Sequence, residues 1–279
     1  MPITEAMPDI ELSAGVFHYA ISGNGTPILF IHGLGAEMSS WRNQVSFFET
    51  AYRVITVDLR GHGHSRAVRP PKRMTDYAAD IAEFLSRLHL PPVHVVGLSL
   101  GGMVALQLAL DAPERVHRLV LVNTLADARL KTMKSRWFFW HRLGLVSILG
   151  MTVTGMAVAK KLFPGPDQAD VRRTFVQEYR QNDRRMYRAA IRAIAGWCVT
   201  DRLHEIHSPV LIVAAEHDYL PFSEKQAMAE KLPVADIRII HDSYHATPVD
   251  QSSVFNRIVL GFLADSINNT ASSGSRTDR

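Results

Sequence analysis

The chain has 279 residues, of which 47% are hydrophobic, and this suits one large globular domain or a core domain that carries a substantial insertion. The formal net charge is only +4 at pH 7 and the basic residues are scattered, so a nucleic-acid partner is not expected. The single cysteine, Cys198, excludes an intrachain disulfide, and the first residues lack the basic and apolar regions of a leader, so we expect a cytoplasmic protein.

Strands and helices alternate along the first part of the chain. Short runs rich in Val, Ile and Leu predict strands buried on both faces, at residues 16–21, 27–31, 53–57, 93–97 and 117–122. Helical patterns lie between them, at residues 40–50, 74–89 and 101–112. Strand alternating with helix implies right-handed crossovers, so we predict an α/β fold with a mostly parallel sheet.

The alternation is interrupted once. Residues 125–201 show helical patterns only, and then a strand, a helix, a strand and a long closing helix follow, at 209–214, 223–231, 236–240 and 249–266. We therefore predict an α/β core in two blocks, an all-helical cap between them, and a flexible polar tail. The predicted boundaries are 1–124 and 202–267 for the core, 125–201 for the cap and 268–279 for the tail.

One stretch of the insertion is long and uncharged. Residues 143–159 carry no charged side chain, but their length is at the lower limit of a membrane span, and they include glycine and hydroxyl residues. We therefore do not expect a membrane partner.

The motif Gly97-Leu-Ser99-Leu-Gly101 stands where the strand at 93–97 gives way to the helix at 101–112. A serine between two glycines at such a junction is typical of a nucleophile elbow, in which the hydroxyl lies at the carboxyl edge of the sheet. The following helix adds its positive dipole end beside any developing charge. The alternative interpretation is a glycine-rich turn with an incidental serine.

Further motifs follow neighbouring strands. His32-Gly-Leu-Gly35 ends the strand at 27–31, and Asp58-Leu-Arg-Gly-His-Gly-His-Ser65 follows the strand at 53–57. Together with the elbow and the loops described next, they make residues 10–265 resemble the α/β-hydrolase family, in its capped serine esterase and lactonase branch. The resemblance implies a mostly parallel central sheet flanked by helices, with the helical cap inserted after the sixth strand.

The same resemblance assigns roles within these two loops. The backbone N–H groups of Leu34 and Leu100 are expected to form the oxyanion hole, where two preorganised donors stabilise the charge of acyl transfer. Asp58 and Arg60 are interpreted as a structural ion pair or hydrogen-bonding group. His62 and the histidine two residues later are not a metal pair, because no further ligand stands nearby with suitable spacing.

The acid of a catalytic triad is expected next, because this fold orders its triad as nucleophile, acid, base. Asp218 lies in the loop after the strand at 209–214, with a proline three residues later, and it is our candidate. Asp127, after the strand at 117–122, is the alternative, since some relatives place the acid there. Glu216 is interpreted as a solvated residue.

The base is expected between the last strand and the last helix. His245 lies in that loop, while its competitor His241 directly follows the strand at 236–240. Tyr244 precedes His245, where many relatives have glycine, so the shape of the loop departs from the family pattern.

These residues imply a serine hydrolase that cleaves carboxylic esters through an acyl-Ser99 intermediate. His245 serves as general base and Asp218 orients it, without a metal or an organic cofactor. The aromatic residues 137–140, the apolar stretch 143–159 and Trp197 either line an acyl pocket or only pack the cap onto the core. The expected partner is a small ester or lactone with a small to medium apolar acyl group.

Other activities remain open at this point. Residues 97–103 and 119–124 resemble the corresponding runs of 3-oxoadipate enol-lactonases, which makes lactone hydrolysis an alternative. Carbon-carbon bond hydrolases and cofactor-free perhydrolases share the triad. Haloalkane dehalogenase chemistry is disfavoured, because it requires aspartate at position 99. A non-catalytic ligand-binding cup is a hypothesis from another class.

Overall fold

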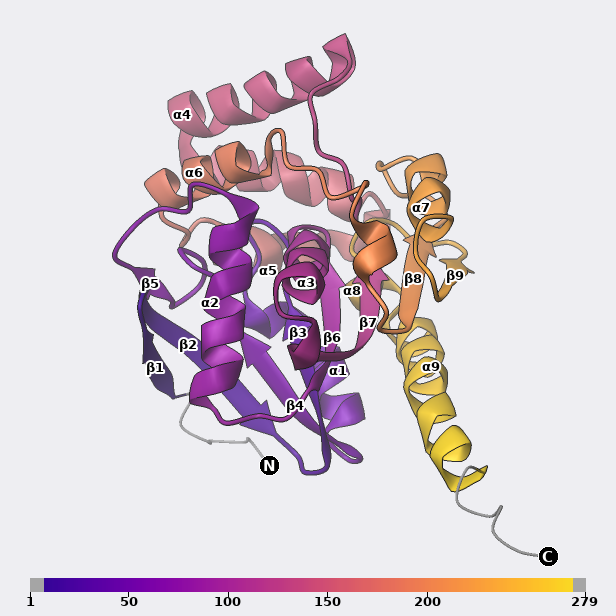
Figure 1. Ribbon diagram of the computed structural model, residues 1–279. Coiled ribbons are helices and arrows are strands. Elements are labelled where there is room, and N and C mark those ends of the chain that lie inside the picture. Colours follow the sequence, from indigo (N-terminus) through magenta and orange to yellow (C-terminus); the bar gives the residue numbers. More distant parts are fainter. Residues whose placement is uncertain (1–7, 273–279) are drawn as a thin grey trace, which may run out of the picture.

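A single mixed sheet organises the core (Figure 1). The computed structural model describes residues 8–272, with side chains to residue 264. The strands are β1 (Asp9–Leu12), β2 (Gly15–Ser22), β3 (Thr26–Ile31), β4 (Tyr52–Val57), β5 (Arg66–Ala67), β6 (Val93–Leu98), β7 (Val116–Val122), β8 (Val210–Ala215) and β9 (Ala235–Ile240). Their order is β1-β2-β4-β3-β6-β7-β8-β9, with β5 paired to β2.

From β4 to β9 in this order, each strand pairs with the next in parallel. The pairs β1–β2, β2–β4 and β2–β5 are antiparallel. The predicted fold class is therefore confirmed. The short edge strands β1 and β5 were not predicted, because neither has the apolar run of a strand buried on both faces.

Helices cover both faces of the sheet. They are α1 (Arg42–Phe48), α2 (Met74–Arg87), α3 (Leu100–Asp111), α7 (Phe222–Ala229), α8 (Thr247–Asp250) and α9 (Ser252–Ser272). Short 3-10 helices span Met38–Trp41, Pro113–Arg115, Pro166–Gln168 and Leu203–Glu205. Since α9 runs to Ser272, the first residues of the predicted tail are helical, and residues 273–279 lie outside the described residues.

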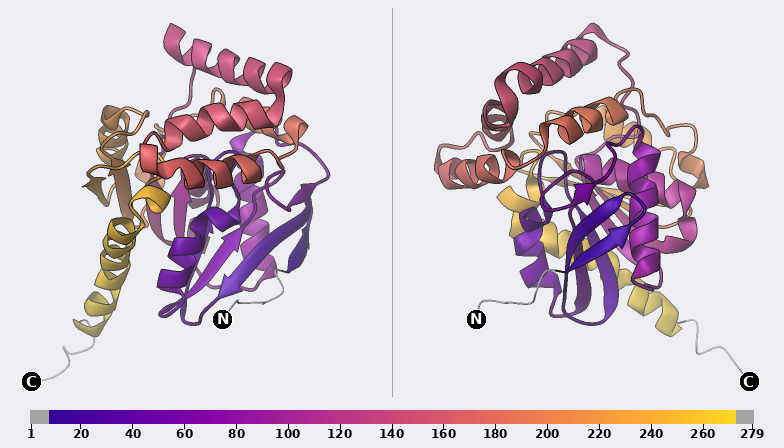
Figure 2. Two further views of the ribbon diagram at one scale, coloured as in Figure 1. Left: turned by 180° about the vertical axis from the view of Figure 1, so that it is seen from behind. Right: turned by 90° about the vertical axis from the view of Figure 1, so that its left-hand side faces the viewer.

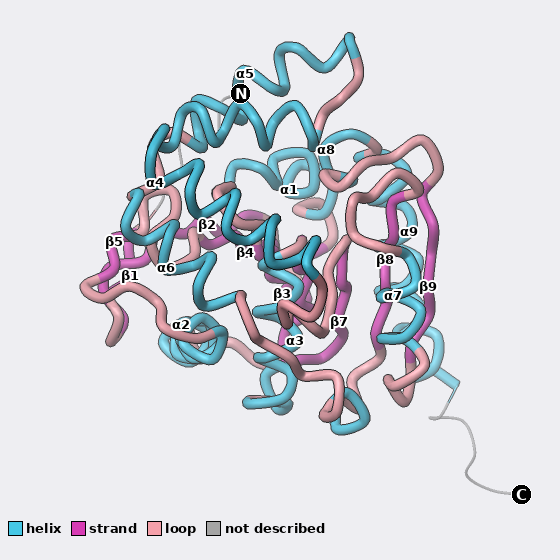
Figure 3. The backbone as a smooth tube through the Cα atoms, turned by 90° about the horizontal axis from the view of Figure 1, so that it is seen from above, coloured by secondary structure: helices cyan, strands magenta, loops and turns pink. Residues whose placement is uncertain are grey.

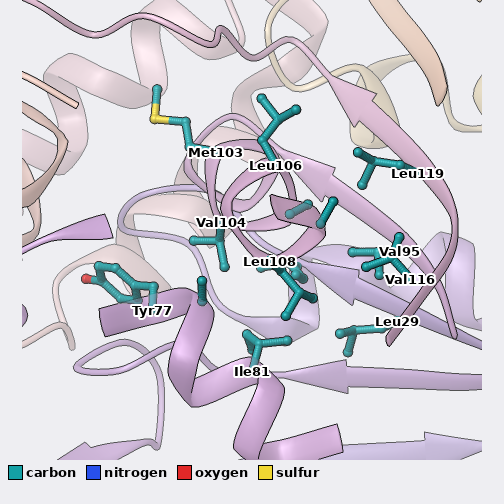
Figure 4. Close-up of a cluster of buried hydrophobic side chains, with 14 of the residues drawn as sticks. Leu29, Tyr77, Ile81, Val95, Met103, Val104, Leu106, Leu108, Val116 and Leu119 are labelled. Carbon is teal, nitrogen blue, oxygen red and sulfur yellow. The ribbon is translucent and has the colours of Figure 1, made fainter. Parts of the chain in front are cut away.

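Alternation along the strands divides the buried side chains between two clusters. Leu29 and Ile31 of β3 pack with α2 and α3, in the cluster of Figure 4, whereas Ile28 and Phe30 pack on the opposite face with α1 and α9. Successive strand residues point to opposite faces, which explains why both positions must be apolar. This packing holds the carboxyl end of β6, where the elbow lies, in a rigid sheet.

The insertion forms a cap of α4 (Met133–Leu162), α5 (Ala169–Tyr179) and α6 (Arg184–Ile194), which lie together across one end of the core (Figures 2 and 3). The cap follows β7, which is the sixth strand when the two-residue β5 is left out. Backbone hydrogen bonds join its two ends, from Ala128 N to Trp197 O at 2.8 Å and from Val199 N to Ala126 O at 2.9 Å. The chain therefore leaves and re-enters the core at one point.

Helix α4 contains the uncharged stretch and is bent within it. Gly150 has φ 77° and ψ −175°, a conformation that glycine adopts without a Cβ penalty. By length and composition alone α4 could cross a membrane, with a mean hydropathy of 1.6, and one third of that window is buried in the fold. Its residues Val146 and Met151 pack with Tyr179 and Tyr187 of the other cap helices.

Candidate active site

The backbone at Ser99 is strained as an elbow requires. Ser99 joins β6 to α3 with φ 54° and ψ −111°, in the positive-φ region that side chains disfavour. A Cβ on Gly97 would lie 2.3 Å from the carbonyl oxygen of Gly101, and one on Gly101 would lie 2.1 Å from that of Ile31. Both glycines are therefore needed for the tight turn, and its serine faces a cavity under the cap.

Asp218 and His245 lie together beside that cavity. His245 Nδ1 donates to Asp218 Oδ1 at 2.7 Å, and both side chains are almost completely buried. The amide of Asn123, at the end of β7, donates to the carbonyl oxygen of His245 at 2.9 Å, and its oxygen accepts from Ala215 N at 2.8 Å. The Asn123 side chain thus joins the end of β8, which leads into the Asp218 loop, to the His245 loop.

A buried lysine completes the surroundings of Asp218. Lys225 Nζ, on α7, lies 2.7 Å from Asp218 Oδ2 and also donates to the carbonyl oxygen of Leu220 at 3.2 Å. Burial acts to raise the pKa of Asp218, but the hydrogen bonds and charges of His245 and Lys225 outweigh it and hold this pKa below its ordinary value. The carboxylate therefore stays charged beside the imidazole.

The structure places the alternative residues elsewhere. Asp127 is engaged by Arg129, with Nη2 2.7 Å from Oδ2, and by Lys131. Exposed Glu216 accepts from Asp242 N at 3.0 Å and pairs with His241, whose side chain is 77% exposed. None of these groups contacts His245 among the described residues.

The loop before Leu34 is held by a buried histidine. His32 Nδ1 donates to the carbonyl oxygen of Gly33 at 2.8 Å, and Nε2 accepts from Leu59 N at 3.0 Å. Burial lowers the pKa of His32 to about 4, so it is neutral near pH 7 and shapes the loop. A Cβ on Gly33 would lie 3.6 Å from Ser99 Cβ, which shows how closely this loop passes the serine.

Leu100, the other proposed oxyanion residue, is the first residue of α3. Backbone N–H groups in a first helical turn have no partner within the helix. Leu34 and Leu100 both line cavity space that Ser99 also lines. Their positions are compatible with an oxyanion hole.

Asp58 and Arg60 do not form an ion pair with each other, so of the two interpretations the ion pair is wrong and the hydrogen-bonding group remains. Arg60 Nε donates to Asp80 Oδ2 at 2.7 Å, while Asp58 accepts from the backbone N–H groups of Met38 and His64, each at 2.8 Å. Asp58 is a hydrogen-bonding group, with one backbone donor in its own turn and one at the start of the 3-10 helix Met38–Trp41. The arginine instead reaches α2.

Tyr219 lies between Ser99 and His245. Its Oη lies 3.1 Å from His245 Nε2, the two ring centroids are 4.2 Å apart, and its hydroxyl also interacts with the side chain of Ser99. Because Nδ1 of His245 donates to Asp218, Nε2 of the neutral ring is an acceptor, and the Tyr219 hydroxyl donates to it. This bond occupies the lone pair with which His245 would accept the Ser99 proton if it serves as the predicted base.

Tyr219→Phe is therefore expected to accelerate phosphonylation of Ser99 by a fluorophosphonate about fivefold. A neutral hydrogen bond contributes about 1 kcal/mol, and its loss frees the base while the ring is retained. The rate of labelling measured by intact-protein mass spectrometry checks this, with Tyr244→Phe as the neighbouring control. Slower labelling in Tyr219→Phe would instead mean that the hydroxyl passes the proton from serine to histidine.

Two cavities meet at Ser99, with volumes of about 190 and 250 Å³. Phe138, Leu145 and Val158 of α4 line the first, whereas Ile191 and Ile194 of α6 line the second. Other aromatic residues of the insertion have a different place: Trp137 and Trp140 are exposed, and Trp197 donates from Nε1 to Gln107 of α3 at 2.8 Å. The insertion therefore contributes both to the cavity walls and to docking.

Spacing alone does not reveal Lys225, Tyr219 or Asn123. Tyr219 adjoins Asp218 in sequence, and that adjacency was the one local signal for it. Lys225 reaches Asp218 only because α7 folds back over the acid loop, and Asn123 only because β7 ends between both loops.

The residues 26–250 match the model of the α/β hydrolase fold family, and the chain belongs to that family. It is 33% identical to the putative carbamate hydrolase RutD of Variovorax paradoxus, over 88% of this chain and 96% of that protein. It is 26% identical to 3-oxoadipate enol-lactonase 2 of Acinetobacter baylyi, over 93% and 97%. The enol-lactonase structure from Burkholderia xenovorans superposes with a TM-score of 0.85 at 24% identity, covering 92% of this chain and all of that one.

These comparisons confirm the family and the likeness to 3-oxoadipate enol-lactonases. With the fold and these relatives, the protein is a hydrolase. The likeness to carbamate hydrolases was not predicted.

Proposed function

We propose that this hydrolase cleaves carboxylic esters with Ser99 as nucleophile, His245 as base and Asp218 as acid. The observation that carries the proposal is the buried Asp218–His245 pair, which lies with the strained Ser99 at one cavity. A serine hydroxyl is a weak nucleophile until a neighbouring base takes its proton. This geometry supports His245 as that base and Asp218 as the carboxylate that orients it.

The steps follow from the atoms. Once substrate displaces the Tyr219 hydroxyl, Ser99 Oγ attacks the ester carbonyl and His245 Nε2 takes its proton. Asp218 keeps the imidazole in the tautomer with hydrogen on Nδ1 and stabilises the cation that forms. The oxyanion receives hydrogen bonds from the N–H groups of Leu34 and Leu100. His245 protonates the leaving alkoxide, and then activates the water that hydrolyses acyl-Ser99.

The substrate class is proposed from the cavity. A volume of about 190 Å³ with side chains such as Leu145 and Val158 suits a small to medium acyl group. A lactone is a cyclic ester and uses the same steps, and the relative named 3-oxoadipate enol-lactonase favours it as second candidate. We further propose that residues 125–201 form the cap domain. We also propose that the enzyme is cytoplasmic and requires no membrane, nucleic acid or cofactor.

Initial rates on a series of p-nitrophenyl esters, together with lactones and a carbamate, test this function. Each buried methylene contributes about 0.8 kcal/mol, so we expect kcat/KM to rise at least tenfold from acetate to a medium chain and then to level off. Equal rates from two to eight carbons would contradict an acyl role for the cavity. If only the carbamate or only a lactone is turned over and no open-chain ester is cleaved, that class would replace carboxylic esters as the proposed substrate.

A further inference from the structure

Two cationic side chains face the cavity at Ser99 without a carboxylate partner. Arg142 and Lys161, both on α4, line it, and no aspartate or glutamate stands among the described residues that do so. Arg142 is half-buried against the Tyr187 ring, and Lys161 is exposed and lies over the rings of Phe138 and Tyr219. Their charge is available to a ligand in the cavity.

Arg142 is held in place by a neutral group. Its Nε donates to Tyr187 Oη at 2.8 Å, and its guanidinium carbon lies 5.7 Å from the centre of the Tyr187 ring. Tyr187 is fully buried and packs against Tyr179, so the arginine is anchored to the cap core. This contact orients the guanidinium, and no carboxylate of the described residues pairs with its charge.

Lys161 lies over the tyrosine that covers the base. Its Nζ is 3.9 Å from the centre of the Tyr219 ring and 4.7 Å from that of Phe138. Such cation–π contacts attract a cation without neutralising it. Partial burial and the charge of Arg142 lower the pKa of Lys161, which shows that the two cations are near enough to repel each other. An anion between them would relieve that repulsion.

The charge of Asp218 partly offsets the lowering of the Lys161 pKa, but among the described residues Asp218 forms no ion pair with Lys161 or Arg142. The two oxygens of Asp218 are engaged by His245 Nδ1 and Lys225 Nζ, each at 2.7 Å. Tyr219 contacts His245 through its hydroxyl and Lys161 through its ring. It therefore lies between the lysine and the Asp218–His245 pair.

We propose that Arg142 and Lys161 form an anion subsite for a carboxylate at the far end of the substrate. The proposal rests on the proposed function and deepens it: the substrate is an ester or lactone whose apolar chain spans the cavity and ends in a carboxylate. Guanidinium pairs well with the two oxygens of a carboxylate, and the lysine adds a point charge. A chain end held there leaves the ester carbonyl at Ser99.

A matched pair of substrates tests the subsite. Monomethyl adipate has a terminal carboxylate, and methyl 6-amino-6-oxohexanoate has a carboxamide of nearly the same shape without the charge. We expect wild-type kcat/KM to favour the carboxylate at least tenfold, mainly through a lower KM. Arg142→Gln and Lys161→Gln should each reduce this ratio to near one.

Lys160→Gln is the control, because Lys160 is exposed, adjoins Lys161 and does not line the cavity. It should keep the wild-type ratio. An equal loss of the ratio in Lys160→Gln, or no preference in the wild-type enzyme, would overturn the subsite. Arg142→Lys keeps the charge if Arg142→Gln fails to fold, and it should retain part of the preference.

Binding without turnover separates this proposal from the proposed function. Adipate, but not adipamide, should raise the melting temperature of folded Ser99→Ala, and Lys161→Gln in that background should remove the effect. If neither ester is cleaved and Ser99 is not labelled by a fluorophosphonate, the proposed function fails while the adipate shift still decides the subsite. If the carboxamide ester is cleaved at Ser99 without a preference for charge, the subsite alone fails.

Discussion

Ser99→Ala is expected to abolish fluorophosphonate labelling and to lower kcat on esters by about three to six orders of magnitude. The hydroxyl is the group to which the acyl chain would be attached, and no covalent intermediate forms without it. The residual rate comes from the oxyanion donors and substrate binding. The melting temperature should change little, since alanine loses one hydroxyl and keeps the same strained backbone.

Peptide mass mapping of the labelled wild-type enzyme checks the site, with one phosphonate per chain expected on Ser99. Ser40→Ala is the matched control, because Ser40 also lines the cavity while its hydroxyl only donates to the carbonyl oxygen of Glu37 at 2.7 Å. It should label and turn over normally. Wild-type turnover of an ester by folded Ser99→Ala would overturn the serine mechanism and favour the ligand cup or another chemistry.

Asp218→Asn is expected to lower kcat by about four orders of magnitude and to destabilise the fold by about 3–5 kcal/mol. The first effect follows because asparagine favours the wrong tautomer of His245. The second follows because the ammonium of Lys225, only 1% exposed, loses its counter-ion in the interior. Because of this buried lysine, we expect Asp218→Asn to affect stability as well as activity.

The double variant Asp218→Asn with Lys225→Gln separates the two effects. Urea unfolding should show most of the lost stability restored, since no unpaired charge is left buried, while kcat stays low. Asp127→Asn should lower kcat only slightly. A severe loss in Asp127→Asn with a mild one in Asp218→Asn would place the acid after β7.

The depressed pKa of Asp218 also gives the pH range of its contribution. A carboxyl whose pKa is lower in the folded state stabilises the fold fully above its unfolded value of about 3.9. That contribution is lost only as pH falls below about 4, through the folded pKa. The gap in unfolding free energy between wild type and Asp218→Asn should therefore persist from pH 7 to about 5 and narrow at more acidic pH.

The sequence by itself determined the features that depend on neighbours along the chain. Val93 to Gly97 is apolar apart from the buried His94 because its strand is buried on both faces, and the glycines around Ser99 mark a turn in which a Cβ has no room. The alternation of such runs with amphipathic helices was enough to predict the fold class. Its interruption was enough to predict the cap. These signals are local, so they can be recognised without coordinates.

Only the tertiary structure decided which distant side chains meet. Asp218 and Asp127 both follow strands at the carboxyl edge, and the choice between them depends on where the His245 loop lies and on Arg129, which engages Asp127. The same holds for Lys225 beside Asp218, for Tyr219 over His245, and for the cationic pair Arg142 and Lys161. These residues meet because distant elements pack together or because one element folds back on its neighbour. Their contacts depend on how whole helices and loops pack. No fixed spacing in the sequence marks two residues that meet in this way, so such a pair cannot be recognised without the structure.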